Sequence, residues 1–132
     1  VGSTGDLPIE SSHLSGREVC MESHSRIVEA LHRNGVAVVR LFFEGEHYVL
    51  LTGEKDGRVF LFDPYYLPDG PVSEGIESTL KQPFQYNRVV PFALFNREEG
   101  LYALGRETDR EAVLIFDKRT RLTEEKDIEY FI

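Results

Sequence analysis

Two residues of the sequence could carry out acid–base chemistry together, His47 and Asp63. Each stands at one end of an apolar run, and Asp56-Gly57 lies between the two runs. A carboxylate that accepts a hydrogen bond from one imidazole nitrogen fixes the ring tautomer and stabilises the imidazolium. The other nitrogen can then take the proton of a thiol, so a neighbouring cysteine becomes a nucleophilic thiolate. The alternative is a surface histidine near a strand end and an aspartate that begins an Asp-Pro turn.

Whether His47 and Asp63 meet depends on the register of the hairpin that joins them. Residues 47–52 and 58–62 predict two antiparallel strands, and Asp56-Gly57 is a strong hairpin signal. A loop of three or five residues would place the two side chains directly opposite each other, with Cβ atoms about 4.5–5.5 Å apart. A strict two-residue turn would direct them to opposite faces of the sheet. A β-bulge near the turn would restore the meeting.

A helix and a strand are expected to come before this hairpin. Residues 23–33 predict the helix, because Ser23 is a good N-cap and the apolar residues behind it follow helical spacing. Asn34-Gly35 predicts its end, with the glycine in the left-handed position. Residues 36–43 form a nearly continuous β-branched and aromatic run, which predicts a central strand buried on both faces.

The second half of the chain predicts loops and another hairpin. From Asp63 to about residue 89 the sequence is irregular, and proline early in 91–96 favours a short helix there. The second hairpin is expected to pair residues 101–104 with residues 112–116. The tail, 122–132, predicts either a short acidic helix or an edge strand.

Length and composition predict one folded domain. The 132 residues, 41% of them hydrophobic, suffice for a single core. We expect a loop or arm over 1–16, which is rich in Gly and Ser, and the folded unit over 17–132. The net charge of −8 disfavours both nucleic acid and anionic membrane surfaces as partners.

The single cysteine and the lack of a signal peptide predict a reducing, cytoplasmic compartment. An internal disulfide is impossible with one cysteine, and no apolar run is long enough to span a membrane. No His, Cys or carboxylate stands at a recognised zinc spacing, so we expect neither a metal nor another cofactor.

The hairpin resembles part of a known peptidase family. The segments His47-Tyr48-Val49-Leu50-Leu51-Thr52-Gly53 and Val59-Phe60-Leu61-Phe62-Asp63-Pro64 are similar to the second half of the double-glycine, bacteriocin-processing cysteine peptidases, cysteine peptidase family thirty-nine. The resemblance is best to stand-alone bacterial relatives and covers residues 14–117. It includes Asp63-Pro64-Tyr65-Tyr66, Tyr86-Asn87-Arg88, Tyr102-Ala103-Leu104-Gly105 and Arg110-Glu111-Ala112-Val113-Leu114.

This resemblance implies both a fold and a pair of site residues. The implied fold is of the α+β class, a papain-like half-domain with one main helix followed by an antiparallel sheet of about five strands. The implied catalytic residues are His47 as the base and Asp63 as its orienting partner. Tyr65 and Tyr66 would then either form a wall for an extended peptide or pack the loop against the sheet.

The nucleophile of the family has no counterpart in this sequence. The family carries it in an Asp-Cys-Gly segment that opens a helix, with a Gln just upstream, and neither is present here. The chain begins with Val1 rather than Met, so we expect the nucleophile to belong to a missing N-terminal part. Cys20 could substitute, because it precedes the predicted helix, where a thiolate is stabilised. Its apolar neighbours favour an inert, partly buried thiol instead.

Three functions remain open from the sequence. The first is a peptidase-like hydrolase with a peptide substrate, inactive as this chain alone because the nucleophile is lacking. The second is a non-catalytic peptide-binding or regulatory module. The third is a structural remnant whose apolar strand, 36–43, exposes surface that its own missing N-terminal half or a homodimer partner would cover.

Overall fold

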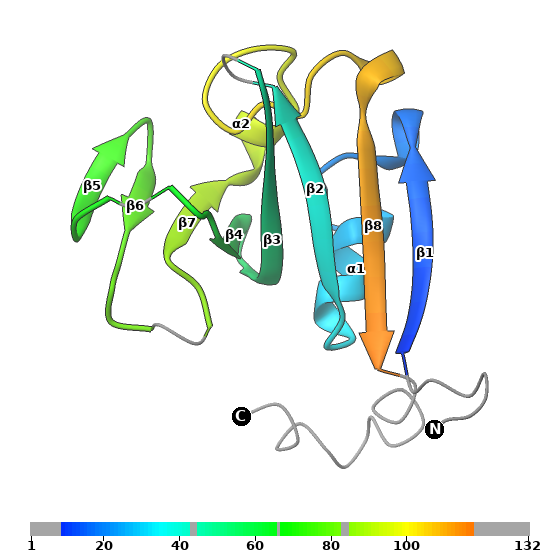
Figure 1. Ribbon diagram of the computed structural model, residues 1–132, viewed down its shortest axis with the longest axis horizontal. Coiled ribbons are helices and arrows are strands. Elements are labelled where there is room, and N and C mark those ends of the chain that lie inside the picture. The colour runs from blue at the N-terminus through cyan, green and yellow to red at the C-terminus, as the bar shows by residue number, and fades with distance from the viewer. Residues whose placement is uncertain (1–8, 43–44, 66, 83–84, 118–132) are drawn as a thin grey trace.

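The computed structural model of the chain describes residues 9–42, 45–65, 67–82 and 85–117. In these ranges eight strands form one antiparallel sheet, in the order β1-β8-β2-β3-β4-β7-β6-β5 (Figure 1). The strands are β1 (Ile9–Ser15), β2 (Val36–Phe42), β3 (Glu46–Lys55), β4 (Arg58–Phe62), β5 (Gly70–Ser73), β6 (Ile76–Ser78), β7 (Arg88–Pro91) and β8 (Glu111–Asp117).

The predicted α+β, papain-like half-domain of one helix and about five strands is wrong. Strands occupy parts of both stretches expected to be loops, namely β1 in the N-terminal arm and β5, β6 and β7 after Asp63. The expected strand at 101–104 is absent, and its intended partner in β8 pairs with β1 and β2 instead. The described chain is therefore mostly an eight-stranded antiparallel sheet. The expected tail helix or edge strand, 122–132, lies outside the described residues.

The helix of the first half is confirmed, with a different cap. The α-helix α1 (Arg26–His32) begins after Ser25, whose side chain accepts from the backbone N–H of Val28, whereas Ser23 is exposed. Asn34, not the following glycine, takes the left-handed conformation after the helix, with φ of 66°. The short helix α2 (Phe92–Phe95) begins directly after Pro91, as predicted. Two 3-10 turns complete the helical elements of the described ranges, η1 (Gly16–Glu18) and η2 (Glu107–Asp109).

The central strands bury one face each. In β2, Ala37, Val39 and Leu41 are buried, whereas the alternate residues are only half-buried, so the prediction of burial on both faces is wrong. The same alternation continues in β3 and β4. Adjacent side chains of a strand point to opposite faces, so one set contacts the core and the other lies at the surface.

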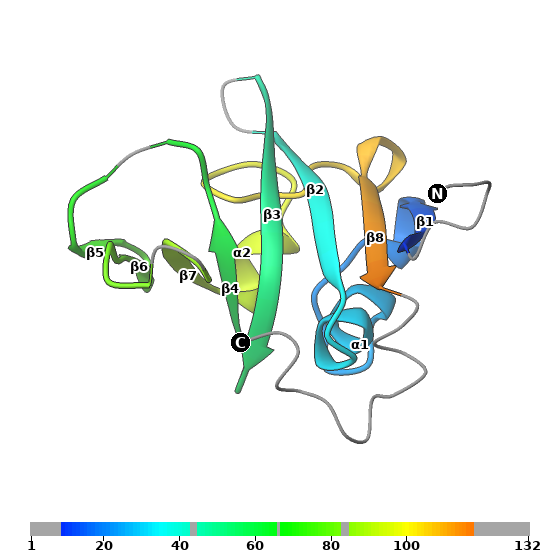
Figure 2. The same cartoon turned by 60° about the horizontal axis from the view of Figure 1, so that its bottom comes forward.

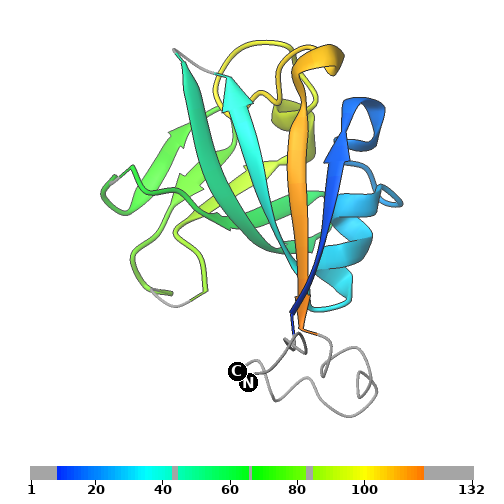
Figure 3. The ribbon, with the colours of Figure 1, turned by 45° about the vertical axis from the view of Figure 1, so that its right-hand side comes forward.

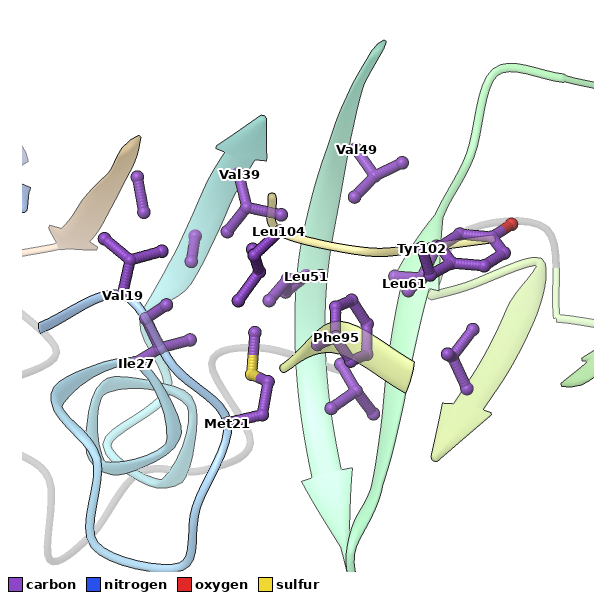
Figure 4. Packing of buried hydrophobic residues seen from close by; sticks show 14 of the residues in the cluster. Val19, Met21, Ile27, Val39, Val49, Leu51, Leu61, Phe95, Tyr102 and Leu104 are labelled. Atoms are coloured by element: carbon purple, nitrogen blue, oxygen red, sulfur yellow. The ribbon is translucent and has the colours of Figure 1, made fainter. Parts of the chain in front are cut away.

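The core lies between the buried face of the sheet and the helices. Helix α1 packs against β2, β3 and β8, and α2 packs near β7 (Figures 1 and 2). Turned sideways, the sheet is seen to bend strongly, with α1 on one side of it (Figure 3). Figure 4 shows side chains from both layers meeting in the core, among them Ile27 of α1, Leu51 of β3 and Phe95 of α2.

Candidate active site

A β-bulge brings His47 and Asp63 to the same face of the sheet. The β3–β4 hairpin has a two-residue turn, with φ of 54° at Asp56 and 83° at Gly57, and its first pairs are in the register that would separate the two side chains. The register then shifts between Leu51 and Gly53. Because a one-residue shift exchanges the faces of a strand, His47 and Asp63 both come to the buried side.

The bulged residue is held in place by its own side chain. The Thr52 hydroxyl lies 3.2 Å from the carbonyl oxygen of Phe60 and 2.7 Å from that of Gln85. These contacts join the bulge to the neighbouring strand and to the segment before β7. The conditional prediction of a bulge that restores the meeting is confirmed.

His47 and Asp63 form a direct hydrogen bond. The His47 Nε2 atom lies 2.9 Å from Asp63 Oδ1. The Asp63 side chain is 6% exposed and the His47 side chain 35% exposed, so the carboxylate is shielded and the imidazole reaches solvent. Within the described ranges, Nδ1 of His47 has no hydrogen-bond partner. The ring therefore has one nitrogen bound to the carboxylate and one available to a ligand.

Asp63 is fixed through its backbone and both of its carboxylate oxygens. Oδ1 also accepts from the backbone N–H of Tyr65, and Oδ2 accepts from the hydroxyl of Tyr102 at 2.5 Å. The Asn87 side chain accepts from the backbone N–H of Asp63 and donates to its carbonyl, both at 2.8 Å. The carboxylate thus sits in a defined orientation at the end of β4.

A buried cation lies beside this cluster. Arg88 is 1% exposed and donates to the Tyr65 carbonyl, the Asn87 carbonyl and the Ser78 hydroxyl. No carboxylate of the described residues forms an ion pair with it. The positive charge of Arg88 acts on Tyr102, and both side chains line the same cavity as Asp63.

The cluster opens into a cavity of about 350 Å³. His47, Asp63, Arg88 and Tyr102 form its polar wall, and Glu46 lies beside them. Four aliphatic side chains and one exposed aromatic complete the lining: Leu41, Leu67, Val72, Leu101 and Tyr65. A cavity with apolar walls and a few converging polar groups is the usual form of a ligand site.

The second residue of the Tyr pair and the cysteine do not join this site. Tyr65 lines the cavity and is 70% exposed, whereas Tyr66 lies outside the described residues. Cys20 is half-buried and is not among the lining residues. Burial, and to a smaller extent the charge of Glu22, raise the pKa of the Cys20 thiol, while Arg110 acts in the opposite direction. A thiol with a raised pKa is a poor nucleophile at neutral pH.

Three residues of the site were not predicted, Asn87, Arg88 and Tyr102. All three stand in segments that the family resemblance covers, Tyr86-Asn87-Arg88 and Tyr102-Ala103-Leu104-Gly105. No spacing rule could have placed them, because the hydrogen bonds to Asp63 cross 24 and 39 residues of sequence.

The described ranges contain no cluster of three or more His, Cys, Asp or Glu side chains arranged to hold a metal. The other histidines with acidic partners stand apart, His13 with Glu111 and His32 with Glu54. None of the described helices is both long and apolar enough to span a bilayer.

The arrangement at His47 can hold a proton on Nδ1 and can stabilise the resulting imidazolium through Asp63. Among the residues that the structure describes, the cavity lining contains no Ser, Thr or Cys that could act as a nucleophile. Comparison with family models, with curated proteins and with solved structures found no match to this chain.

Proposed function

We propose that this chain is a cysteine-peptidase-like module that contributes the catalytic base and its orienting carboxylate. The observation that carries the proposal is the 2.9 Å hydrogen bond from His47 Nε2 to Asp63 Oδ1, made by a histidine that lines the cavity and whose Nδ1 has no partner among the described residues. The thiol would come from another polypeptide, because Cys20, the one cysteine of this sequence, is not among the lining residues of the cavity. The single cysteine supports a reducing, cytoplasmic location for this chemistry.

The reaction would follow acyl transfer. The thiol gives its proton to Nδ1 of His47, and the thiolate attacks the carbonyl carbon of a peptide bond. The C–N bond breaks as the imidazolium returns this proton to the leaving amine, which leaves a thioester. Water then attacks the thioester and gives a proton to His47, which returns it to the sulfur as the C–S bond breaks, so that the acid and the free thiol are released. Asp63 stabilises the imidazolium throughout and stays ionised.

A non-catalytic peptide-binding module is the second candidate. It is favoured by the lack of a nucleophile in the cavity lining and by the raised pKa of Cys20. The aliphatic walls would accept an apolar side chain of an extended peptide, and Tyr65 would cover it from the rim. Here His47 would act only as a hydrogen-bonding group.

An experiment that asks whether His47 can activate a thiol distinguishes the hydrolase from the binding module. Leu41 lies opposite His47 in the β2–β3 register and lines the same cavity, so Leu41→Cys places a thiol across from the imidazole. We expect the pH of half-maximal alkylation by iodoacetamide to fall about 1–3 units below that of Cys20 for this thiol. Peptide mass mapping measures the alkylation of the thiol at position 41 and of Cys20 separately.

The control variants identify the source of the shift. Adding His47→Ala or Asp63→Asn should return the introduced thiol to an ordinary pH profile. Val72→Cys, also in the cavity lining but on β5, should not show the shift. Circular dichroism confirms that each variant is folded. An introduced thiol at position 41 that titrates in the same way with and without His47 rejects the hydrolase proposal and leaves the binding module.

A further inference from the structure

Tyr102 has a contact with the site that the proposed chemistry does not yet use. It lies on the segment between α2 and η2, 39 residues from Asp63 in sequence, and is 8% exposed. Its ring packs edge-on against Phe95, with the ring centroids 6.2 Å apart. Figure 4 shows Tyr102 at the border of the core, with its hydroxyl oxygen directed away from the labelled aliphatic side chains.

The hydroxyl can act only as a donor toward Asp63. Burial, followed by the hydrogen bond and the charge of Asp63, raises the pKa of Tyr102, and Arg88 only partly opposes this. The phenol therefore stays protonated at neutral pH. Its proton points to Asp63 Oδ2 at 2.5 Å, because a carboxylate can accept but not donate when ionised.

This bond adds to what holds the carboxylate in its orientation. The bonds from His47 and from the Tyr65 backbone both reach Oδ1, and a turn about the Cβ–Cγ bond would break them together with the bond to Oδ2. The bond from Tyr102 is the one that occupies Oδ2 within the described ranges. With both oxygens held, Oδ1 stays aimed at His47.

The backbone at Tyr102 is in a conformation that an aromatic residue rarely adopts. Its φ is 63°, in the left-handed region, where a side chain with a Cβ is strained. Two backbone hydrogen bonds that span Tyr102 hold it there, from Ala103 N–H to the Gly100 carbonyl and from Leu104 N–H to the Phe95 carbonyl. A strained residue persists only where its surroundings over-determine it, and here the surroundings direct the hydroxyl to Asp63.

We propose that Tyr102 is a positioning residue of this site, which holds the Asp63 carboxylate in the orientation that fixes the His47 ring through its Nε2 at the wall of the cavity. Its catalytic meaning rests on the proposed function.

The test measures the His47–Asp63 bond directly, without substrate or added thiol. Nitrogen-15 NMR of the imidazole follows the exchange of the Nε2 proton with water. The Tyr102→Phe variant keeps the ring against Phe95. We expect the exchange to be about tenfold faster in this variant, because losing one hydrogen bond to a charged group changes an equilibrium constant by about that factor. Tyr48→Phe is the matched control, because Tyr48 is 52% exposed on the opposite face, and it should leave the exchange unchanged.

A second replacement of Tyr102 tests the proposal if the Tyr102→Phe variant does not fold. Replacing Tyr102 by 3,5-difluorotyrosine makes the hydroxyl a stronger donor at nearly the same size, so the proton of His47 should exchange more slowly. An exchange rate that neither replacement changes, in folded protein, overturns the positioning role. The alkylation of the Leu41→Cys thiol tests the proposed function, whereas the exchange rate of the His47 proton tests the role of Tyr102. Either result can be negative while the other is positive, so the two failures are distinguishable.

Discussion

At the scale of single residues, the two oxygens of the Asp63 carboxylate bind different side chains, and the two nitrogens of the His47 ring have different surroundings. Nε2 of His47 is bound to Asp63 Oδ1, and Oδ2 is bound to Tyr102. The Asn87 amide fixes the Asp63 backbone by a pair of reciprocal bonds. A histidine base is effective when its orienting carboxylate is held in place, and here both oxygens of the Asp63 carboxylate accept hydrogen bonds.

Cys20 provides a prediction at this scale. Because burial and then Glu22 raise the pKa of its thiol, little thiolate exists at neutral pH. We expect alkylation by iodoacetamide to be slow at pH 7 and its rate to rise with pH to a midpoint above the ordinary value of about 8.5. Mass spectrometry of samples quenched at successive times, over a series of pH values, measures this alkylation rate.

Glu22→Gln is the matched control for Cys20. Removing the negative charge should lower the pKa of the thiol and speed alkylation at a fixed pH, since Glu22 is one cause of the increase. A Cys20 midpoint below that of a free cysteine would contradict the assignment of an inert thiol and would make Cys20 a candidate nucleophile again.

At the scale of elements, the β3–β4 hairpin places the pair and helix α1 supports the strands behind it. The Thr52 bulge decides the face of His47, and α1 covers β2 and β3 from the core side. The start of α1 depends on Ser25, whose hydroxyl accepts from the backbone N–H groups of Glu22 and Val28 and donates to the Glu22 carbonyl.

The helix cap gives a prediction at this scale. Ser25→Ala removes the acceptor of two backbone N–H groups at the start of α1, so we expect the free energy of unfolding to fall by about 1–2 kcal/mol. Ser23→Ala, at the exposed position that the sequence alone favours as the cap, should change it by less than about 0.5 kcal/mol. Urea denaturation followed by circular dichroism measures both. Equal losses in the two variants would mean that the helix begins elsewhere.

At the scale of the whole molecule, segments far apart in sequence are joined by side-chain bonds to backbone. The Asn96 side chain accepts from the backbone N–H of Met21 at 2.9 Å and donates to its carbonyl at 3.0 Å, across 75 residues. The Arg110 guanidinium donates to the Val19 carbonyl, across 91 residues. These contacts attach the segment before α1 to both ends of the region, 96–110, that carries Tyr102.

Asn96 gives the prediction at this scale. Asn96→Ala leaves both backbone groups of Met21 without their partner, so we expect a loss of about 1–3 kcal/mol in the free energy of unfolding. Asn96→Asp can still accept from the N–H but cannot donate to the carbonyl, so its loss should be smaller. Thermal and urea unfolding of the two variants give the comparison. An Asn96→Ala variant as stable as the parent would show that this connection does not hold the two segments together.

The amino-acid sequence by itself determined the local features of this protein. The helix after residue 23, the strands around 36–42, 46–55, 58–62 and 111–117, and the turn at Asp56-Gly57 follow from local periodicity and turn chemistry. His47 and Asp63 could be singled out in the same way, because they stand at the ends of these elements.

Tertiary structure alone decided the rest. Strands β5, β6 and β7 are three or four residues long, and β1 carries no strong alternation, so each depends on a partner rather than on its own sequence. The partner of β1 is β8, about 100 residues away. The bulge at Thr52 and the bond from Tyr102 to Asp63 likewise arise from contacts between distant segments. The sequence therefore left open whether His47 meets Asp63. The pattern of the two strands does not show where a bulge will shift their pairing by one residue, and such a shift exchanges the faces of the strand.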